Sequence, residues 1–276
     1  MREERATWAL VTGATSGLGE AIAERLVIAG YHVMIVGRSA EALERASAGL
    51  SARARYPHQR VLSVSVDLHQ VGAADQLLKR AKDKALSVAI LAAADYAYGA
   101  FTEITPERHE QLIQCNIIAT ARLIQGVLDQ MDQQRRGRVL VVGSLGAMMP
   151  SPYQSAYTAS KAWLHQFISC VQAERGRRPV TLTLGCPGGM KTPMLLNSPA
   201  WTRLRRLPWV RLSIITPQAA ARILLRATFA GRLRSVPGIL NGLTALSLRV
   251  IPHRVSLWLG RSLFGRQSAL DNKQNR

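Results

Sequence analysis

The chain has 276 residues, of which 47% are hydrophobic and 19% charged, and this composition suffices for one large α/β core. Its three cysteines, Cys115, Cys170 and Cys186, lie far apart in the sequence and argue against both a disulfide framework and a cysteine-rich metal site. We therefore expect a reducing compartment and no bound metal.

Positive charge is concentrated in the C-terminal part of the chain. Residues 1–174 contain 18 Lys and Arg against 16 Asp and Glu, a net charge of +2, whereas residues 175–276 contain 18 against one, a net charge of +17. The C-terminal part therefore either faces something anionic or carries solvated arginines. Because these arginines accompany long apolar runs rather than a recognisable nucleic-acid-binding module, no nucleic acid partner is expected.

The sequence begins with the charged stretch Met1-Arg2-Glu3-Glu4-Arg5 and enters the first predicted strand without an apolar signal region. No linker rich in Pro, Gly or Ser divides the chain. We expect a cytoplasmic protein built on a single globular domain.

An apolar run from Thr7 to Thr12 predicts the first strand, and it enters the segment Gly13-Ala14-Thr15-Ser16-Gly17-Leu18-Gly19. A helical pattern follows, formed by Ala21, Ile22, Leu26 and Val27. A strand, a glycine-rich turn and a helix in this order are the outline of a dinucleotide-binding site.

The end of the second predicted strand, Tyr31 to Gly37, bears on the choice of cofactor. An acidic residue there would bind the adenosine ribose hydroxyls and repel a 2′-phosphate, but this chain has Gly37-Arg38-Ser39. Arg38 can fork onto a phosphate, and Ser39 can add a hydrogen bond or cap the next helix. This favours NADP(H); NAD(H) stays open, since Arg38 could instead stack on the adenine.

The middle of the chain predicts helices over Ala40 to Arg55 and from Thr105 to about Gln134, with Thr105 as cap, and strands over Val61 to Val66 and Ser87 to Ala93. Asp67 and Leu68 follow the third strand. Asp67 could border a bound nucleotide or cap a helix beginning near Gln70.

The strand predicted over Gly137 to Gly143 ends at Ser144, and open α/β sheets bind ligands at this end of their strands. Downstream, Tyr157-Thr158-Ala159-Ser160-Lys161 places a phenol and an ammonium four residues apart, on one face of a helix. The positive charge would favour the phenolate and bring the pKa of Tyr157 toward neutral pH, which suits proton exchange with a carbonyl or alcohol. The alternative is an ordinary surface pair.

A further strand, Val180 to Gly185, enters Cys186-Pro187-Gly188-Gly189-Met190-Lys191-Thr192-Pro193. The following segment up to Ile215 holds many large apolar residues, which indicate either a lid over an apolar substrate or an additional core. A helix over Pro217 to Ala230 and a short strand over Ser235 to Pro237 complete the pattern.

The last part of the chain contains two apolar runs with arginines at their margins, Ile239 to Ile251 and Arg254 to Phe264, separated by Pro252. Neither reaches the roughly 20 apolar residues that a membrane-spanning helix needs. They suit an anionic membrane surface, or a helical hairpin packed on the protein's own core or on another subunit. Asp271 to Arg276 is predicted to be frayed.

Taken together, the Thr-Gly-x-x-x-Gly-x-Gly turn at Thr12–Gly19, the strand-end Ser144, and Tyr157 with Lys161 resemble the short-chain dehydrogenase/reductase family. The order and spacing of these motifs hold from about Thr7 to Gly238. The resemblance implies a Rossmann-type doubly wound parallel sheet of about seven strands with helices on both faces. We expect an NADP-binding catalytic domain at 1–238, with a substrate loop at about 189–215, and an apolar, basic helical extension at 239–276.

The resemblance also implies site residues. Tyr157 would exchange a proton with the substrate oxygen, Ser144 would orient that oxygen, Lys161 would lower the Tyr157 pKa and bind the nicotinamide ribose, and Asn116 would hold a proton-relay water. The cofactor-binding residues would be Gly13, Thr15, Ser16, Gly17, Leu18, Gly19, Arg38, Ser39, Asp67, Leu68, Ala93, Tyr157, Lys161, Pro187, Gly188, Met190 and Thr192. The expected reaction is NADPH-dependent hydride transfer to or from a carbonyl or alcohol on a hydrophobic substrate, in a homo-oligomer assembled through the helices bearing Asn116 and Tyr157.

One segment departs from the family pattern. Ala92-Ala93-Ala94-Asp95 stands where the family has Asn-Asn-Ala-Gly. The Asn side chains normally tie neighbouring backbone together, so their loss predicts a less rigid nicotinamide side of the site, and Asp95 would add negative charge near the cofactor. The alternative function is therefore a catalytically weak NADP-binding regulatory or scaffold protein.

Overall fold

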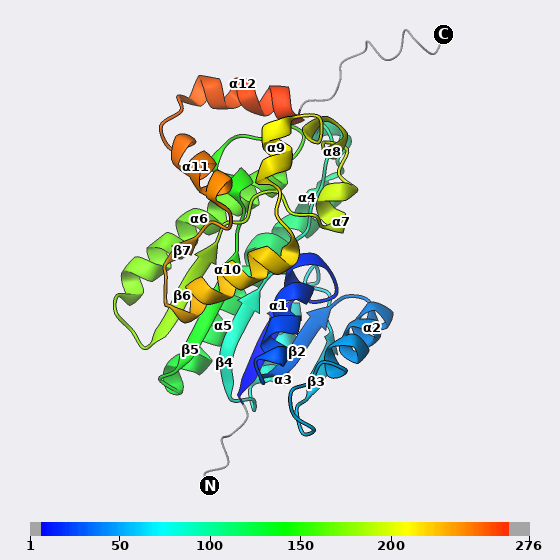
Figure 1. Ribbon diagram of the computed structural model, residues 1–276, viewed down its shortest axis with the longest axis vertical. Helices are drawn as coiled ribbons and strands as arrows, with labels where there is room; N and C mark the ends of the chain where they lie inside the picture. The colour runs from blue at the N-terminus through cyan, green and yellow to red at the C-terminus, as the bar shows by residue number, and fades with distance from the viewer. Residues whose placement is uncertain (1–6, 265–276) are drawn as a thin grey trace.

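A computed structural model describes residues 7–264, and these contain a seven-stranded parallel sheet in the order β3-β2-β1-β4-β5-β6-β7 (Figure 1). The predicted Met1–Arg5 and Asp271–Arg276 segments lie outside the described residues. The strands are β1 (Trp8–Thr12), β2 (His32–Gly37), β3 (Val61–Ser65), β4 (Leu86–Leu91), β5 (Gly137–Val142), β6 (Val180–Gly185) and β7 (Arg234–Ser235). The Rossmann-type fold predicted from the sequence is confirmed.

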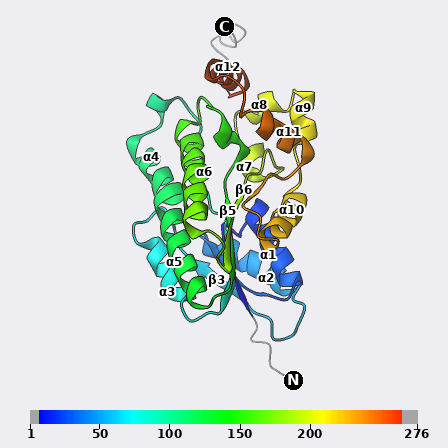
Figure 2. The same cartoon turned by 90° about the vertical axis from the view of Figure 1, so that its left-hand side faces the viewer.

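Helices cover both faces of the sheet (Figure 2). The α-helices of the described residues are α1 (Gly17–Ile28), α2 (Ala40–Ser51), α3 (Ala73–Ala81), α4 (Pro106–Ile113), α5 (Thr120–Gln133), α6 (Ser155–Arg175), α7 (Pro193–Leu196), α8 (Trp201–Leu204), α9 (Pro208–Ser213), α10 (Pro217–Phe229), α11 (Ile239–Ser247) and α12 (His253–Phe264). Short 3-10 helices lie at Phe101–Glu103 and Leu145–Met148.

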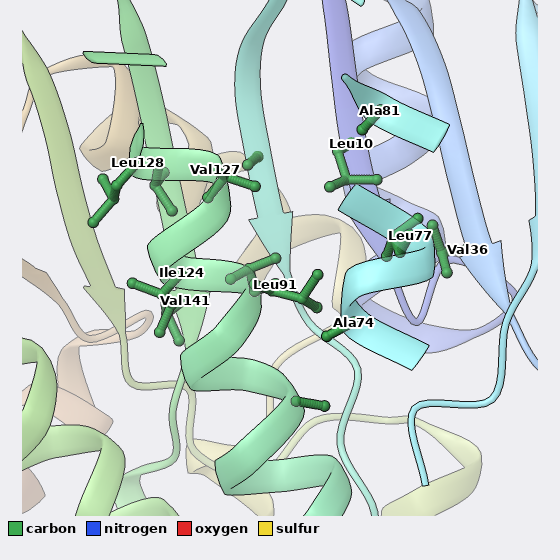
Figure 3. Packing of buried hydrophobic residues seen from close by; sticks show 14 of the residues in the cluster. Leu10, Val36, Ala74, Leu77, Ala81, Leu91, Ile124, Val127, Leu128 and Val141 are labelled. Atoms are coloured by element: carbon green, nitrogen blue, oxygen red, sulfur yellow. The ribbon is translucent and has the colours of Figure 1, made fainter. Parts of the chain in front are cut away.

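The core is divided by the sheet into two layers. Residues of α1, α2 and α10 pack on one face, and residues of α3, α5 and α6 pack on the other. In the second layer, Leu77 and Ile124 lie over strand residues such as Leu91 and Val141 (Figure 3). The central strands are rich in Val, Ile and Leu and are buried on both faces, because helices from both layers exclude water from them.

The direction in which strands are added to the sheet changes at the boundary between β1 and β4. Strands β2 and β3 lie on one side of β1, whereas β4 to β7 lie on the other. The carboxyl ends of β1 and β4 therefore diverge into the connections of opposite layers, and this topological switch point is where doubly wound sheets form a ligand cleft.

The helix predicted from Thr105 to about Gln134 is interrupted by a π-helical turn. Thr105 caps α4 as predicted, since its hydroxyl accepts from the Arg108 N–H. The helix then widens to π geometry at Gln114–Ala119 before α5 begins. Thr120 Oγ1 donates to the Cys115 carbonyl at 3.1 Å and so satisfies one backbone acceptor within this turn.

Asp67 does not cap a helix, which was one of the two roles considered for it. Helix α3 begins at Ala73 and has Gly72 as its N-cap, with φ of 80°. The Asp67 carboxylate instead accepts from the His69 backbone N–H at 3.2 Å and lies 2.6 Å from His69 Nδ1. The Asp67 side chain thus interacts with a loop residue two positions away, and both residues precede α3.

Helices α11 and α12 lie at the same end of the molecule as α7, α8 and α9 (Figures 1 and 2). Helix α11 contacts α9, and α12 contacts α8. Gly260 of α12 packs so closely on the Pro150 carbonyl that a Cβ at this position would collide with it. No helix among residues 7–264 has the length and apolar character needed to cross a membrane.

Candidate active site

A cavity of about 510 Å³ opens at the carboxyl ends of the strands. Its walls come from the glycine-rich turn, the ends of β2, β4, β5 and β6, and helices α6, α7, α8, α9, α11 and α12. The predicted site residues that line it are Gly13, Thr15, Ser16, Gly17, Leu18, Gly19, Arg38, Leu68, Ala93, Ser144, Tyr157, Lys161, Pro187, Gly188, Met190 and Thr192.

The glycine-rich turn brings backbone close to neighbouring segments of the cleft. Gly13 has φ of 67°, and a Cβ on it would lie 2.9 Å from Ala93 Cα. Gly17 has φ of 59°, and a Cβ on it would lie 3.0 Å from Thr192 Cγ2. The glycines thus leave open a backbone cradle at the N-terminus of α1, whose N–H groups and positive dipole end suit a diphosphate.

The adenosine end of this cradle is formed by loops after β2 and β3. Arg38 lines the cleft with an exposed side chain, as predicted. Ser39 does not line it; its hydroxyl accepts from the Ala42 N–H at 3.2 Å and caps α2. Asp67 does not line the cleft either, but the His69 ring that it contacts does.

Three predicted catalytic side chains meet in the cleft. Ser144 follows β5, and Tyr157 and Lys161 lie one turn apart on α6. The Ser144 hydroxyl accepts from the Gly146 N–H at 3.1 Å, and it lowers the pKa of the Tyr157 phenol. Lys161 Nζ lies 5.9 Å from the centre of the Tyr157 ring. A hydroxyl, a phenol and an ammonium therefore converge on one wall of the cavity.

Burial changes the proton affinity of two of these groups. Burial lowers the pKa of Lys161 to about 8, and its ammonium donates to the Val142 carbonyl at 3.0 Å. Burial also raises the pKa of Tyr157, against the opposing effect of the Ser144 hydrogen bond. The predicted lowering of the Tyr157 pKa by Lys161 is not what the structure shows, because burial has the larger effect and the opposing effect comes from Ser144. Burial thus favours the protonated phenol over the phenolate.

Asn116 lies behind the cleft rather than in its wall. Its Oδ1 accepts from the Asp95 N–H at 2.7 Å, and its Nδ2 donates to the Asp95 carbonyl at 2.9 Å and to Ser160 Oγ at 3.1 Å. The Ser160 hydroxyl donates in turn to the Tyr157 carbonyl at 2.7 Å. Asn116, at the centre of the π-helical turn, therefore connects the chain after β4 to the helix that carries Tyr157 and Lys161.

The expectation that Asp95 adds negative charge near the cofactor is wrong. Its carboxylate accepts from both terminal nitrogens of Arg108 and contacts His69 Nε2 at 3.0 Å, with only 11% of the side chain exposed. Burial alone would raise the pKa of Asp95, but the hydrogen bonds from Arg108 and His69 outweigh it and hold the pKa below its usual value. The charge is neutralised inside the protein and does not line the cleft.

The predicted loss of rigidity in the Ala92-Ala93-Ala94-Asp95 segment is also not what the structure shows. The N–H groups of Ala92 and Ala93 both donate to Thr12 Oγ1 at 3.1 Å. Asp95 is fixed by Asn116 through its backbone and by Arg108 through its side chain. Other side chains therefore make the ties that the two missing Asn residues would make.

Two polar residues of the cleft have no counterpart in the sequence-based prediction. The Tyr96 hydroxyl lies 2.9 Å from Ser198 Oγ, and the Tyr96 ring meets the Tyr157 ring edge to face, with centroids 5.2 Å apart. Burial raises the pKa of Tyr96 to about 12. The sequence could have indicated Tyr96 as a site residue, because it follows the fourth predicted strand and ligands bind at the carboxyl ends of strands. No sequence pattern indicated Ser198.

The opposite wall of the cleft is apolar. The predicted substrate loop folds into α7, α8 and α9, and side chains from it and from the C-terminal helices line the cavity: Met194, Leu195, Leu204, Trp209, Val210, Leu248, Leu263 and Phe264. The Tyr98 hydroxyl donates to the Phe264 carbonyl at 2.8 Å and fixes the end of α12 there. Both the loop and the extension therefore shape the cavity.

The described residues contain no group of three or more His, Cys, Asp or Glu side chains that could hold a metal ion. Within the same part of the chain, Cys115 and Cys186 are buried free thiols and Cys170 is an exposed one.

Comparison with known proteins places the site in a family. The family model described as short chain dehydrogenase matches residues 7–203. A 7beta-hydroxysteroid dehydrogenase from Clostridium sardiniense is 28% identical over 71% of this chain and 74% of its own length. A fatty acyl-CoA reductase from Acinetobacter baylyi is 29% identical over 88% of this chain and 85% of its own length.

A solved structure of a 3-oxoacyl (acyl-carrier-protein) reductase from Agrobacterium tumefaciens with NADP bound has a TM-score of 0.72 and is 25% identical, over 85% of this chain and 94% of that one. With the family match over most of the chain and the same α/β architecture, this protein belongs to the short-chain dehydrogenase/reductase family of oxidoreductases.

Proposed function

We propose that this oxidoreductase uses NADPH to reduce a carbonyl on a hydrophobic substrate, or runs the reverse oxidation of an alcohol. The observation that carries the proposal is the convergence of Ser144, Tyr157 and Lys161 on one wall of a cleft that also contains the glycine-rich cradle. When bound in that cradle, the dinucleotide supplies or accepts the hydride at its nicotinamide ring.

The residues of the chain would handle the proton and the substrate oxygen. Tyr157, whose burial favours the protonated phenol, would donate to the carbonyl oxygen during reduction. The Ser144 hydroxyl, held by the Gly146 N–H, would hydrogen-bond that oxygen and fix its position. The Lys161 ammonium would stabilise the phenolate that remains and hold the nicotinamide ribose. Asn116 would hold the proposed relay water, and its hydrogen bond to Ser160 would fix the position of α6.

The preference for NADP(H) over NAD(H) rests on the end of β2. Arg38 lines the cleft there, and no carboxylate stands at Gly37, Arg38 or Ser39 to repel a 2′-phosphate. The guanidinium offers several N–H donors to a phosphate group. The structural relative with NADP bound is in line with this choice.

The substrate class follows from the apolar wall of the cleft. Leu204, Val210, Leu263 and Phe264 offer no hydrogen bonds to a polar substrate but bury apolar surface well. Relatives of this chain are named for a hydroxysteroid and for fatty acyl-CoA. We propose a lipid-like, acyl or polycyclic substrate with a single carbonyl or hydroxyl near Tyr157.

A single-turnover experiment tests this function. Protein preloaded with NADPH is mixed with a reactive hydrophobic diketone, and the loss of reduced-nicotinamide absorbance is followed. Hydride transfer supports the proposal. The alternative, a regulatory or scaffold protein, is favoured by the unusual Ala92–Asp95 segment, and it predicts NADPH binding without any transfer to a range of apolar ketones and aldehydes.

We also propose the assembly and location of the protein. Ile113 and Ile118, beside the α5–α6 layer, are 41% and 53% exposed and suit contact with a second copy. Sedimentation of the full chain reports its assembly, and dissociation by Ile118→Asp would support this interface.

We also propose that the chain divides into a catalytic part at 1–238 and an extension at 239–276. The proposed location is cytoplasmic, with a peripheral position at the inner face of a membrane.

A further inference from the structure

Helix α11 has one face packed against the protein and one exposed apolar face. Asn241 and Ala245 are buried, and Thr244 and Leu248 line the cleft, so this face belongs to the site. The other face carries three exposed apolar side chains at spacings of four and three residues: Ile239, Leu243 and Leu246, exposed by 86%, 57% and 63%. At about 100° per residue these side chains form one stripe that points away from the protein. Val250, in the turn after the helix, is 79% exposed.

Helix α12 repeats this arrangement. Ser256 and Gly260 are buried against the protein, and Leu263 and Phe264 line the cleft. On the outward face, Trp258 is 65% exposed and stands between Arg254 and Arg261, four residues before it and three after. A tryptophan flanked by cations on an exposed helix face is typical of segments that lie at a membrane interface.

Helix α9 extends the same surface. Leu212 is 74% exposed beside the exposed Arg211, and α9 packs against α11. These helices gather at one end of the molecule (Figures 1 and 2). We call the exposed apolar residues and arginines of these helices and of the turn after α11 the end surface: Arg211, Leu212, Ile239, Leu243, Leu246, Arg249, Val250, Arg254, Trp258 and Arg261.

The positive charge of the end surface favours an anionic partner. Residues 175–264 contain no Asp or Glu, so none of these arginines has a carboxylate from its own part of the chain. A second copy docking through the same face would bring arginines against arginines, which costs free energy. An anionic lipid bilayer offers both an apolar interior for the exposed stripe and phosphates for the arginines.

We propose that the end surface docks on an anionic bilayer and that the cleft opens toward the lipid, so that an apolar substrate enters directly from the membrane. Trp209 joins the two regions, because it is 55% exposed and also lines the cleft. Substrate entry depends on the proposed function, whereas docking itself does not.

Vesicle flotation of the full chain tests docking. Wild-type protein floats with vesicles made of equal parts phosphatidylglycerol and phosphatidylcholine, floats less in high salt, and stays behind with phosphatidylcholine alone. The variant Leu246→Asp/Trp258→Asp loses about tenfold or more of its vesicle affinity, because two apolar anchors become anions. Neither residue lines the cleft. Val71→Asp is the matched control, since Val71 is 88% exposed after β3, at the other edge of the sheet, and it leaves flotation unchanged.

Turnover of a water-soluble carbonyl substrate separates this proposal from the proposed function. If NADPH oxidation proceeds but the wild type does not float, docking is wrong and the function stands. If the protein floats but transfers hydride neither to this substrate nor to the hydrophobic diketone, docking stands and the function is wrong. If the wild type is an oligomer that does not bind vesicles, and the Leu246→Asp/Trp258→Asp variant is a monomer, the end surface is a subunit interface. That result would overturn the docking proposal.

Discussion

Lys161 is 2% exposed, and its ammonium donates a hydrogen bond to the Val142 carbonyl. Burial without a neighbouring carboxylate disfavours the charged form, which is why its pKa falls to about 8. Burying the protonated Lys161 beside Tyr157 therefore lowers the stability of the fold, but it places a positive charge where negative charge develops during proton transfer.

This cost predicts a pH dependence of stability. Below pH about 8 the lysine is protonated in both folded and unfolded chains, so it contributes no slope. Between pH about 8 and 10.5 only the unfolded chain holds the proton, so the free energy of unfolding rises with pH through this window. Urea unfolding of the wild type and of Lys161→Met should show a difference that changes by on the order of 3 kcal/mol across it. A constant difference would contradict the buried charge.

Arg38 acts at the other end of the cleft. Changing Arg38 to Gln should weaken NADPH binding by about 1–3 kcal/mol, because one charge-assisted contact to the 2′-phosphate is lost, and should leave NADH binding nearly unchanged. Fluorescence titration with both dinucleotides measures this. Arg45→Gln is the control, since Arg45 is exposed and paired with Glu41. Equal losses for both dinucleotides would mean that Arg38 does not read the phosphate.

At the scale of elements, the site depends on connections between secondary structures. Asn116 joins the π-helical turn to the end of β4 and to α6. Asp95 receives the side chain of Arg108 from α4 and that of His69 from the loop after β3. These ties hold elements from both sides of the switch point around the cleft, although neither Asn116 nor Asp95 lines it.

A double-mutant cycle on the Asp95–Arg108 pair tests this tie. Asp95→Asn and Arg108→Gln should each lower the free energy of unfolding by about 1–2 kcal/mol, and the double variant should lose less than the sum, because each single change leaves a partly buried partner unpaired. The exposed Asp75–Arg122 pair is the control and should couple by less than about 1 kcal/mol. Additive losses at Asp95 and Arg108 would show that the pair does not hold the segment.

The sequence predicted the strands well and the connections poorly. Apolar periodicity and the glycine turn located β1, β2, β5 and β6 to within about two residues, because buried parallel strands need continuous apolar runs. The role of Asp95 was not predictable, since its partners Arg108 and His69 lie at distances in the sequence that no local pattern encodes. The π-helical turn was also invisible, because residue composition does not distinguish it from an α-helix.

At the scale of the whole molecule, the C-terminal extension closes the site. Asn241 donates to the Ser213 and Pro237 carbonyls at 3.1 and 2.8 Å, and Leu263 and Phe264 line the cleft. Composition alone leaves open whether the extension faces a membrane or packs as a helical hairpin on the protein's own core. The structure shows that one face packs and the other is exposed, a distinction that requires knowing where each helix lies.

Removing residues 239–276 should therefore damage the substrate half of the cleft more than the cofactor half. A chain ending at Gly238 should unfold at a lower temperature and show a KM for an apolar ketone raised by about tenfold or more, since apolar walls of the cavity are lost. NADPH affinity, measured by titration of the same protein, should change less. A truncated protein with unchanged KM would show that α11 and α12 take no part in substrate binding.

Single-turnover hydride transfer in a Tyr157→Phe variant tests the proposed mechanism most directly. The change removes one hydroxyl and little shape, so NADPH should bind within a few-fold of wild type while reduction of a reactive hydrophobic diketone falls by about a hundredfold or more. A phenylalanine ring at this position cannot donate the proton that the carbonyl oxygen takes up as hydride arrives. An undiminished rate in this variant, with cofactor binding intact, would contradict the assignment of Tyr157 as the acid.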